Sequence, residues 1–163
     1  MAEAQGVAAF EESRQGKAER IIKRQMWISA GIGALPFPIL DGVAVTSVQL
    51  WMVRDLCRLY NVPFSREWAK ESILSLVGGF ARSALKAIPG VGAIAGALTG
   101  PALSAGSTYA LGKVFIQHFE SGGTLLTFDP RGMRSYFKGY YQEGQRQAAE
   151  PQRQTPATEH SSF

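Results

Sequence analysis

The segment 87–112 constrains this chain more than any other, because it contains no charged side chain between Lys86 and Lys113. It is longer than the ~20 residues that a helix needs to cross a bilayer. Small residues recur within it at every fourth position, which places them in one stripe along a helix: Gly92, Gly96, Gly100, Ser104, Thr108 and Gly112. Side chains this small let a second helix approach closely. The stripe therefore predicts an interface for helix packing or oligomer formation.

Three interpretations of this stripe stay open. It is a membrane hairpin, a close-packed helix in a soluble bundle or oligomer, or a loop. In water each interior glycine costs a helix about 1 kcal/mol relative to alanine, so a helix here requires packing that compensates. Pro101 removes a backbone hydrogen bond inside the predicted helix, and it is the main argument against one straight helix.

The rest of the chain predicts an all-α fold, a compact bundle of about five helices with a glycine-rich helical hairpin. The 163 residues suffice for one domain with a core. Apolar periodicity and turn residues predict helices at about 10–26, 39–60, 66–86, 91–119 and 130–147, with a short β-prone run at 124–128. We expect a flexible N-terminus at 1–9, a single helical domain at 10–147, and a disordered tail at 148–163, where the composition is polar.

Two sets of basic residues predict a surface that contacts a membrane or an acidic partner. The first helix carries Lys17, Arg20, Lys23 and Arg24 on one side, and the last helix carries Arg131, Arg134 and Lys138 among tyrosines and phenylalanine. Such helices bind anionic bilayer surfaces. The alternative is that both basic faces are solvated while the apolar faces pack on the core.

Asp41 is the carboxylate in the most apolar surroundings, because it is the one charge between residues 25 and 53. It follows Pro36-Phe37-Pro38, so it suits a helix cap that accepts hydrogen bonds from backbone N–H groups. A buried polar partner and a role in proton or ion transfer are the alternatives.

The inventory of reactive residues argues against an enzyme. Cys57 is the one cysteine, and its apolar neighbours predict a buried structural thiol. The two histidines, His118 and His160, form no metal-binding or triad pattern. Gly90-Val91-Gly92 departs from a dinucleotide loop, and no phosphate loop exists. We therefore expect no catalytic residues, no metal, no cofactor and no nucleic-acid partner.

The order of several short motifs resembles a bacterial family of unknown function whose relatives include YcjF-like membrane proteins. The resemblance covers about residues 20–120 and rests on Pro36 to Asp41, Gln49, Met52-Val53, Tyr60-Asn61-Val62, Leu85 to Gly92, and Thr108 to Gly112. Members of that family occur alone or fused behind Era/Ras-like small GTPase domains. The resemblance implies a hydrophobic helical module associated with a membrane or a GTPase, and it supplies no catalytic residues.

Together these features predict a non-enzymatic, membrane-associated helical module that self-assembles or docks a partner such as a small GTPase. The expected location is the cytoplasmic side of the inner membrane, with a cytoplasmic location as the alternative. The expected partners are a membrane surface or bilayer and further copies of this chain, and a small GTPase is a further candidate partner. Two other functions stay open: a soluble helical scaffold, and a proton- or ion-conducting membrane assembly that uses Asp41.

Overall fold

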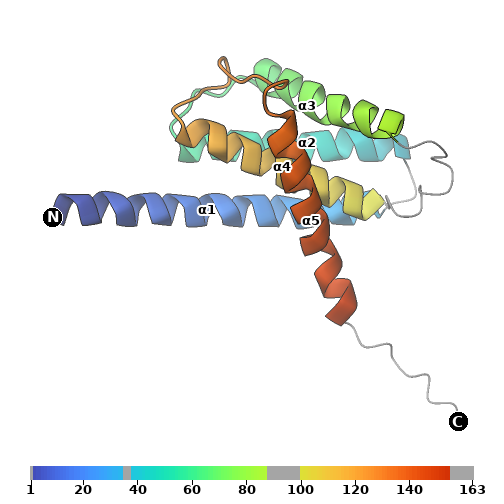
Figure 1. Cartoon of the computed structure of the whole chain (residues 1–163), viewed down its shortest axis with the longest axis horizontal. Helices are drawn as coiled ribbons and strands as arrows, with labels where there is room; N and C mark the ends of the chain where they lie inside the picture. Colours follow the sequence, from blue (N-terminus) through green and yellow to red (C-terminus); the bar gives the residue numbers. More distant parts are fainter. Residues whose placement is uncertain (1, 35–37, 88–99, 155–163) are drawn as a thin grey trace, which may run out of the picture.

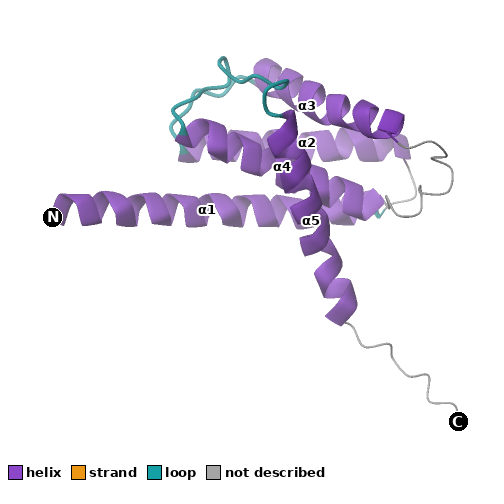
Figure 2. Ribbon diagram, viewed as in Figure 1, coloured by secondary structure: helices purple, strands orange, loops and turns teal. Residues whose placement is uncertain are grey.

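In the computed structural model the chain forms five described helices and no strand in residues 2–34, 38–87 and 100–154, the ranges that the structure describes (Figure 2). The helices are α1 (Ala2–Gly33), α2 (Pro38–Leu59), α3 (Arg66–Ala87), α4 (Gly100–Glu120) and α5 (Arg134–Gln154). The all-α bundle predicted from the sequence is confirmed. The predicted glycine-rich hairpin falls mainly on residues 88–99, which lie outside the described residues.

α4 lies at the centre of the bundle (Figure 1), with α1 and α2 packed along it and α5 crossing it. Most of its side chains from Ala105 to Phe119 are buried: Ala105, Tyr109, Ala110, Leu111, Val114, Phe115, Ile116 and Phe119 are all in the core. α1 and α2 run antiparallel to each other, and α3 packs on α2. A helix that is apolar nearly all round is stable in water only when other helices surround it.

The first helix is longer than predicted. It begins at Ala2 rather than near Phe10, so residues 2–9, predicted as a flexible start, are helical. Alanine is the strongest helix former, and a helix already nucleated by packing extends at little cost. Residues 4–13 are exposed, and Figure 1 shows this end of α1 projecting beyond the bundle. Phe10 is therefore exposed, whereas Ala18 and Ile22 farther along α1 are buried.

The prediction of a β-prone run at 124–128 was wrong. The segment is a turn in which Thr127 donates its backbone N–H to the Thr124 carbonyl (3.2 Å) and accepts a hydrogen bond from the Thr124 N–H on Oγ1 (2.9 Å). Leu125 and Phe128 point into the core, and the Phe128 ring stacks on Phe115 with centroids 4.5 Å apart. β-prone residues form a strand only beside another strand, and the described part of the chain offers none.

Asn61 and Pro101 account for the end of α2 and the start of α4. Asn61 adopts a left-handed backbone conformation (φ 56°) and ends α2, while the Val62 N–H reaches back to the Cys57 carbonyl (2.8 Å). Pro101 is the second residue of α4, in the first turn, where the missing N–H costs nothing. The expected interruption at Pro101 therefore does not occur inside the described helix, and residues 91–99 lie outside the described residues.

The last helix starts later than predicted and also ends later. Asp129 accepts hydrogen bonds from the N–H groups of Arg131 (3.0 Å) and Gly132 (3.2 Å), so it caps a turn that precedes α5 rather than α5 itself. α5 begins at Arg134 and continues beyond the expected end at Gln147 to Gln154. The remainder of the tail predicted to be disordered, residues 155–163, lies outside the described residues.

Gly112 sets the distance between α4 and the α1–α2 pair. A Cβ atom at this position would lie 2.6 Å from Ile22 Cγ1 and 3.1 Å from Met52 Sδ. We expect Gly112→Ala to lower the free energy of unfolding by about 1–2 kcal/mol, since overpacking costs ~1–3 kcal/mol and outweighs the gain in helix propensity. Urea unfolding measures this.

Gly16→Ala is the matched control, because a Cβ atom at Gly16 in α1 has no neighbour within 4 Å. This substitution should raise stability by up to about 1 kcal/mol through helix propensity alone. Equal effects of the two substitutions would contradict the close packing at Gly112.

Cys57 is fully buried in α2, as the sequence predicts. Burial disfavours the thiolate and raises the pKa of the Cys57 thiol from 9.0 to about 11. At pH 8 the thiolate fraction should thus fall by about a hundredfold relative to the unfolded chain, so a disulfide reagent should react at least that much more slowly with the folded protein. Because the folded-state pKa is the higher one, this group stabilises the fold below pH 9, and the contribution is lost between about pH 9 and 11.

Candidate functional site

The small residues of the stripe that the structure describes pack inside the chain. Gly112 lies against Ile22 of α1 and Met52 of α2. Thr108 is fully buried, and Ser104 is partly exposed. Gly92, Gly96 and the surroundings of Gly100 lie outside the described residues. The close approach found here is thus between helices of one chain.

Thr108 belongs to a buried set of polar side chains that joins α1, α2 and α4. Its hydroxyl donates to Ser29 Oγ (2.8 Å) and accepts from Gln49 Nε2 (3.3 Å), which is also 3.4 Å from Ser107 Oγ. Ser29, Gln49 and Thr108 are each at most 2 % exposed. These hydrogen bonds satisfy groups whose burial would otherwise destabilise the fold. This set fixes the register of the three helices.

A second close contact, between α4 and α5, was not predicted. A Cβ atom at Gly144 would lie 3.1 Å from Gly106 Cα and 2.8 Å from Tyr109 Cβ. Tyr109 also donates to Glu143 Oε1 (2.6 Å), and its pKa is raised by burial and then by this hydrogen bond. The two glycines lie far apart in the sequence, so no local periodicity could have paired them.

Asp41 lies in the first turn of α2, which begins at Pro38, so it follows the start of the helix instead of preceding it. Pro38 occupies the first helical position, where proline is favoured. The side chain of Asp41 lies outside the described residues, so its three predicted roles stay predictions.

Of the basic residues predicted on the last helix, Arg134 and Lys138 lie on α5, whereas Arg131 lies in the turn before it. Arg131, Arg134 and Lys138 are exposed. The Arg134 guanidinium lies over α3, where a Cβ atom at Gly79 would be 3.0 Å from its Nη2. The neighbouring aromatic residues Phe137 and Tyr141 are buried in the core, as the packing interpretation predicts.

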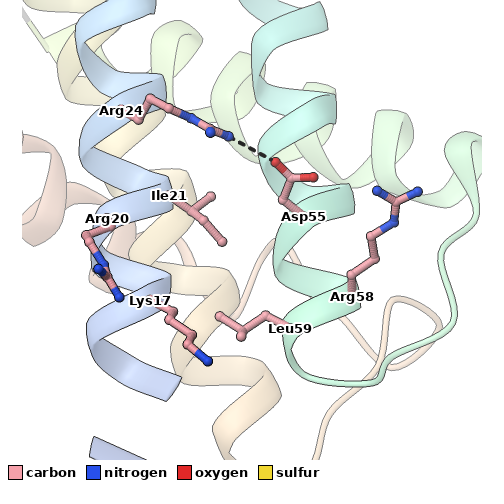
Figure 3. Close-up of a pocket in the computed structure, with 7 residues that line it drawn as sticks. All are labelled: Lys17, Arg20, Ile21, Arg24, Asp55, Arg58 and Leu59. Carbon is pink, nitrogen blue, oxygen red and sulfur yellow. Dashed lines mark hydrogen bonds and ion pairs between the residues drawn. The ribbon is translucent and has the colours of Figure 1, made fainter. Parts of the chain in front are cut away.

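Three of the four basic residues predicted on α1 line a groove between α1 and α2, which we call the basic groove. Its volume is about 590 Å³, and its lining is Lys17, Arg20, Ile21, Arg24, Asp55, Arg58 and Leu59. Lys23 does not line it. Figure 3 shows the Arg24 side chain reaching toward Asp55 of α2, whereas Arg20 lies on the side of α1 away from α2 and Arg58 points away from α1. The contribution of Arg58 was missed, because helix period alone does not say which helix lies beside α1.

The groove has an excess of positive charge. It holds four cationic side chains and one carboxylate, Asp55, and Arg24 pairs with that carboxylate at 3.3 Å. Within the described ranges, Lys17, Arg20 and Arg58 have no acidic group within 4.0 Å. The floor between the two walls is aliphatic, from Ile21 and Leu59. Such a site attracts an anion and offers an apolar surface beneath it.

Exposed aromatic and aliphatic side chains lie toward one end of α1 and α2, where Trp51 also lines a second hollow with Phe64 and Arg66. Two helical turns beyond Arg20, α1 carries Trp27 (45 % exposed), and Ile28 (44 %) lies one turn beyond Arg24. On α2, Trp51 (61 % exposed) lies two turns from Arg58. Because α1 and α2 are antiparallel, these steps lead to the same end of the bundle. We call Trp27, Ile28 and Trp51 the aromatic end, and the basic groove with this end the α1–α2 face.

A cation–π contact joins α1 to the residue that follows α2. The Arg14 guanidinium lies 4.9 Å from the Tyr60 ring centroid, and the Tyr60 hydroxyl donates to Glu120 Oε1 (3.0 Å). Burial, followed by the hydrogen bond to Glu120, raises the pKa of Tyr60. Nearby, Lys113 of α4 pairs with Glu19 of α1. These contacts hold α1 in place where it leaves the bundle.

Residues 2–132 match the family model described as "Domain of unknown function (DUF697)". The chain belongs to this family. It is also 35 % identical over 141 residues to the protein named Magnetosome membrane protein 22 of Magnetospirillum gryphiswaldense, which covers 81 % of this chain and 72 % of that relative. No solved structure matches.

The match confirms the resemblance to a family of unknown function, and the relative is a membrane protein by its name. Among the helices that the structure describes, none combines the length and apolar character needed to cross a membrane. In the same residues no cluster of three His, Cys, Asp or Glu side chains is placed to hold a metal ion.

Thr108→Val tests the buried polar set while keeping the shape of the side chain. It leaves Ser29 and Gln49 without one partner each, so we expect a loss of about 1–3 kcal/mol in the free energy of unfolding. The double variant Ser29→Ala/Thr108→Val should lose less than the sum of the two single variants, since it removes both ends of one hydrogen bond. Strict additivity in urea unfolding would argue against the Ser29–Thr108 hydrogen bond.

Proposed function

We propose that this chain is a non-enzymatic helical module that binds the surface of an anionic membrane through the α1–α2 face. One observation carries the proposal: a groove with an excess of cationic side chains lies between α1 and α2, and both helices also carry an exposed tryptophan. Cations near a bilayer surface are attracted by anionic lipids, each by about 1 kcal/mol. Tryptophan favours the headgroup region, where its ring is half apolar and half hydrated.

The relative named as a magnetosome membrane protein supports a membrane role for this chain. The proposed location is the cytoplasmic side of the inner membrane, since cytoplasmic leaflets are rich in anionic lipid. Self-assembly and docking of a small GTPase stay predictions. Thr108 and Gly112, two stripe residues on which self-assembly was predicted, are buried within the chain.

Vesicle binding tests the proposal. The protein should sediment with vesicles containing about 30 % anionic lipid, and binding should weaken as salt is raised, because screening shortens the reach of surface charges. Arg20→Gln/Arg58→Gln should reduce the partition coefficient by roughly thirtyfold, as two cations contribute about 2 kcal/mol at a membrane surface. Circular dichroism and thermal unfolding should be unchanged, because both side chains are exposed.

Arg131→Gln/Lys138→Gln is the matched control. It removes the same formal charge from the region of α5, away from the α1–α2 face, and should change binding by less than about threefold. An equal loss in both double variants would mean that net charge, rather than this face, governs binding. Recovery of the wild-type protein entirely in the supernatant would favour the soluble scaffold instead.

A further inference from the structure

The first turns of α1 form an arm that extends beyond the rest of the bundle. Residues 4–13 are helical and exposed, and Figure 1 shows this stretch leading away from the other helices. Val7 (59 % exposed), Phe10 (66 % exposed) and Glu11 share one side of it, because residues three or four apart are neighbours on a helix. A helix this short is marginal in water by itself. The arm, residues 4–13, therefore offers an apolar side that none of the other described helices covers.

The hollow between α2 and the start of α3, which we call the α2–α3 hollow, has a complementary character. Its volume is about 510 Å³, and its lining is Ser47, Leu50, Trp51, Arg54, Phe64 and Arg66. Trp51 is 61 % exposed and Phe64 is 37 % exposed. Arg54 and Arg66 are exposed as well, and neither has a carboxylate within 4.0 Å in the described part of the chain. The hollow thus presents aromatic surface beside two cations.

We propose that the arm of one copy of this chain docks on the α2–α3 hollow of a second copy. An amphipathic helix laid into an apolar groove is a recurrent mode of recognition, and tryptophan and arginine are among the residues that contribute most to such contacts. Val7 and Phe10 supply the apolar side, which covers Trp51. Glu11, next to Phe10, supplies a carboxylate for the arginines of the hollow. The inference goes beyond the proposed function and places self-assembly on surfaces other than the small-residue stripe.

Charge favours a contact between these two unlike surfaces. The arm contains two carboxylates, Glu11 and Glu12, and no cation, whereas the lining of the α2–α3 hollow contains two cations and no carboxylate. Two arms side by side, or two hollows face to face, bring like charges together. The same carboxylates disfavour an anionic bilayer as the partner of the arm. Glu11 lies 3.8 Å from Arg14 within its own chain, but an exposed ion pair of this length is weak and engages one of the two carboxylate oxygens.

The direction of α1 explains why the hollow belongs to a second copy. α1 is one helix from Ala2 to Gly33, so the arm continues its line away from the bundle. To reach the α2–α3 hollow of its own chain, the arm must fold back, and the break in α1 leaves backbone groups without their helical partners. A second copy has no such restriction, because it approaches the arm as a separate body.

Sedimentation equilibrium of the full chain without lipid tests the inference, and its result is independent of the membrane proposal. A contact made by the arm alone lies at the lower end of specific interfaces, so the weight-average mass should rise above that of the monomer at about 100 µM or more. Phe10→Gln should weaken this association roughly tenfold or more, since a central aromatic residue carries much of the binding. Wild-type protein that is monomeric at about 500 µM, or undiminished association of Phe10→Gln, would overturn the inference.

Glu11→Arg and Glu12→Arg form a matched pair, because they make the same change of charge on different sides of the arm. Glu12 is two residues from Phe10, which is more than half a turn of helix. Glu11→Arg should weaken association about tenfold, since it brings a cation toward the arginines of the hollow, and Glu12→Arg should change it by less than about threefold. Helix content by circular dichroism should be the same in both, as glutamate and arginine have similar helix propensities. Equal effects on association would exclude docking through this side of the arm.

Mixing two variants distinguishes a contact between unlike surfaces from a symmetric one. Phe10→Gln keeps an intact hollow, and Arg54→Glu/Arg66→Glu keeps an intact arm. Each variant alone should be monomeric at a concentration where the wild-type protein associates, and an equal mixture should form a 1:1 complex from the one intact pair of surfaces. Both arginines are exposed, so thermal unfolding of the double variant should match that of the wild type. A mixture that stays monomeric, or self-association of either variant at the wild-type level, contradicts the inference.

Discussion

The contact of Ile22 and Met52 over Gly112 is the interaction on which the rest of this structure depends. A missing side chain on α4 lets α1 and α2 approach the same point from two sides. Since packed interiors tolerate neither voids nor overlap, this contact fixes the distance of both helices from α4. The opposite sides of α1 and α2 are then left beside each other at the surface. The basic groove exists because a close contact on the inner side brings these two helices together.

Polar side chains have different partners on the inner and outer sides of the α1–α2 pair. On the inner side, Ser29, Gln49 and Thr108 satisfy one another's hydrogen bonds, as burial requires. On the outer side, the groove has four cationic side chains and one carboxylate, Asp55, which pairs with Arg24. Lys17, Arg20 and Arg58 are therefore available to an external anion. Surface ion pairs add little to stability, so this imbalance of charge bears on binding rather than on folding.

The family match places the groove within the shared part of the chain. Residues 2–132 contain α1 to α4 and the turn that follows them, whereas α5 begins at Arg134, beyond the matched stretch. α5 nevertheless packs closely on α4 through Gly106 and Gly144 and buries Phe137 and Tyr141. The proposed membrane face therefore lies within residues 2–132, which match the family, whereas α5 lies outside that stretch and packs on α4.

By itself the sequence determined the helices that carry strong local signals. The start of α3, the end of α2 shortly before Asn61, and the burial of Cys57 follow from propensity, proline placement and apolar period, all of which act over a few residues. The sequence also singled out Lys17, Arg20, Lys23 and Arg24 as one basic face, of which all but Lys23 line the groove.

Only the tertiary structure decided what those elements meet. Residues 124–128 form a turn because no strand lies beside them, and the helical start of α1 stands exposed because the bundle ends before it. Arg58 lines the same groove as Lys17, Arg20 and Arg24 because α2 packs beside α1. The spacing of apolar residues along the sequence determines which side of a helix is apolar. Contacts between residues distant in the chain decide which sides of two different helices come together to form a site.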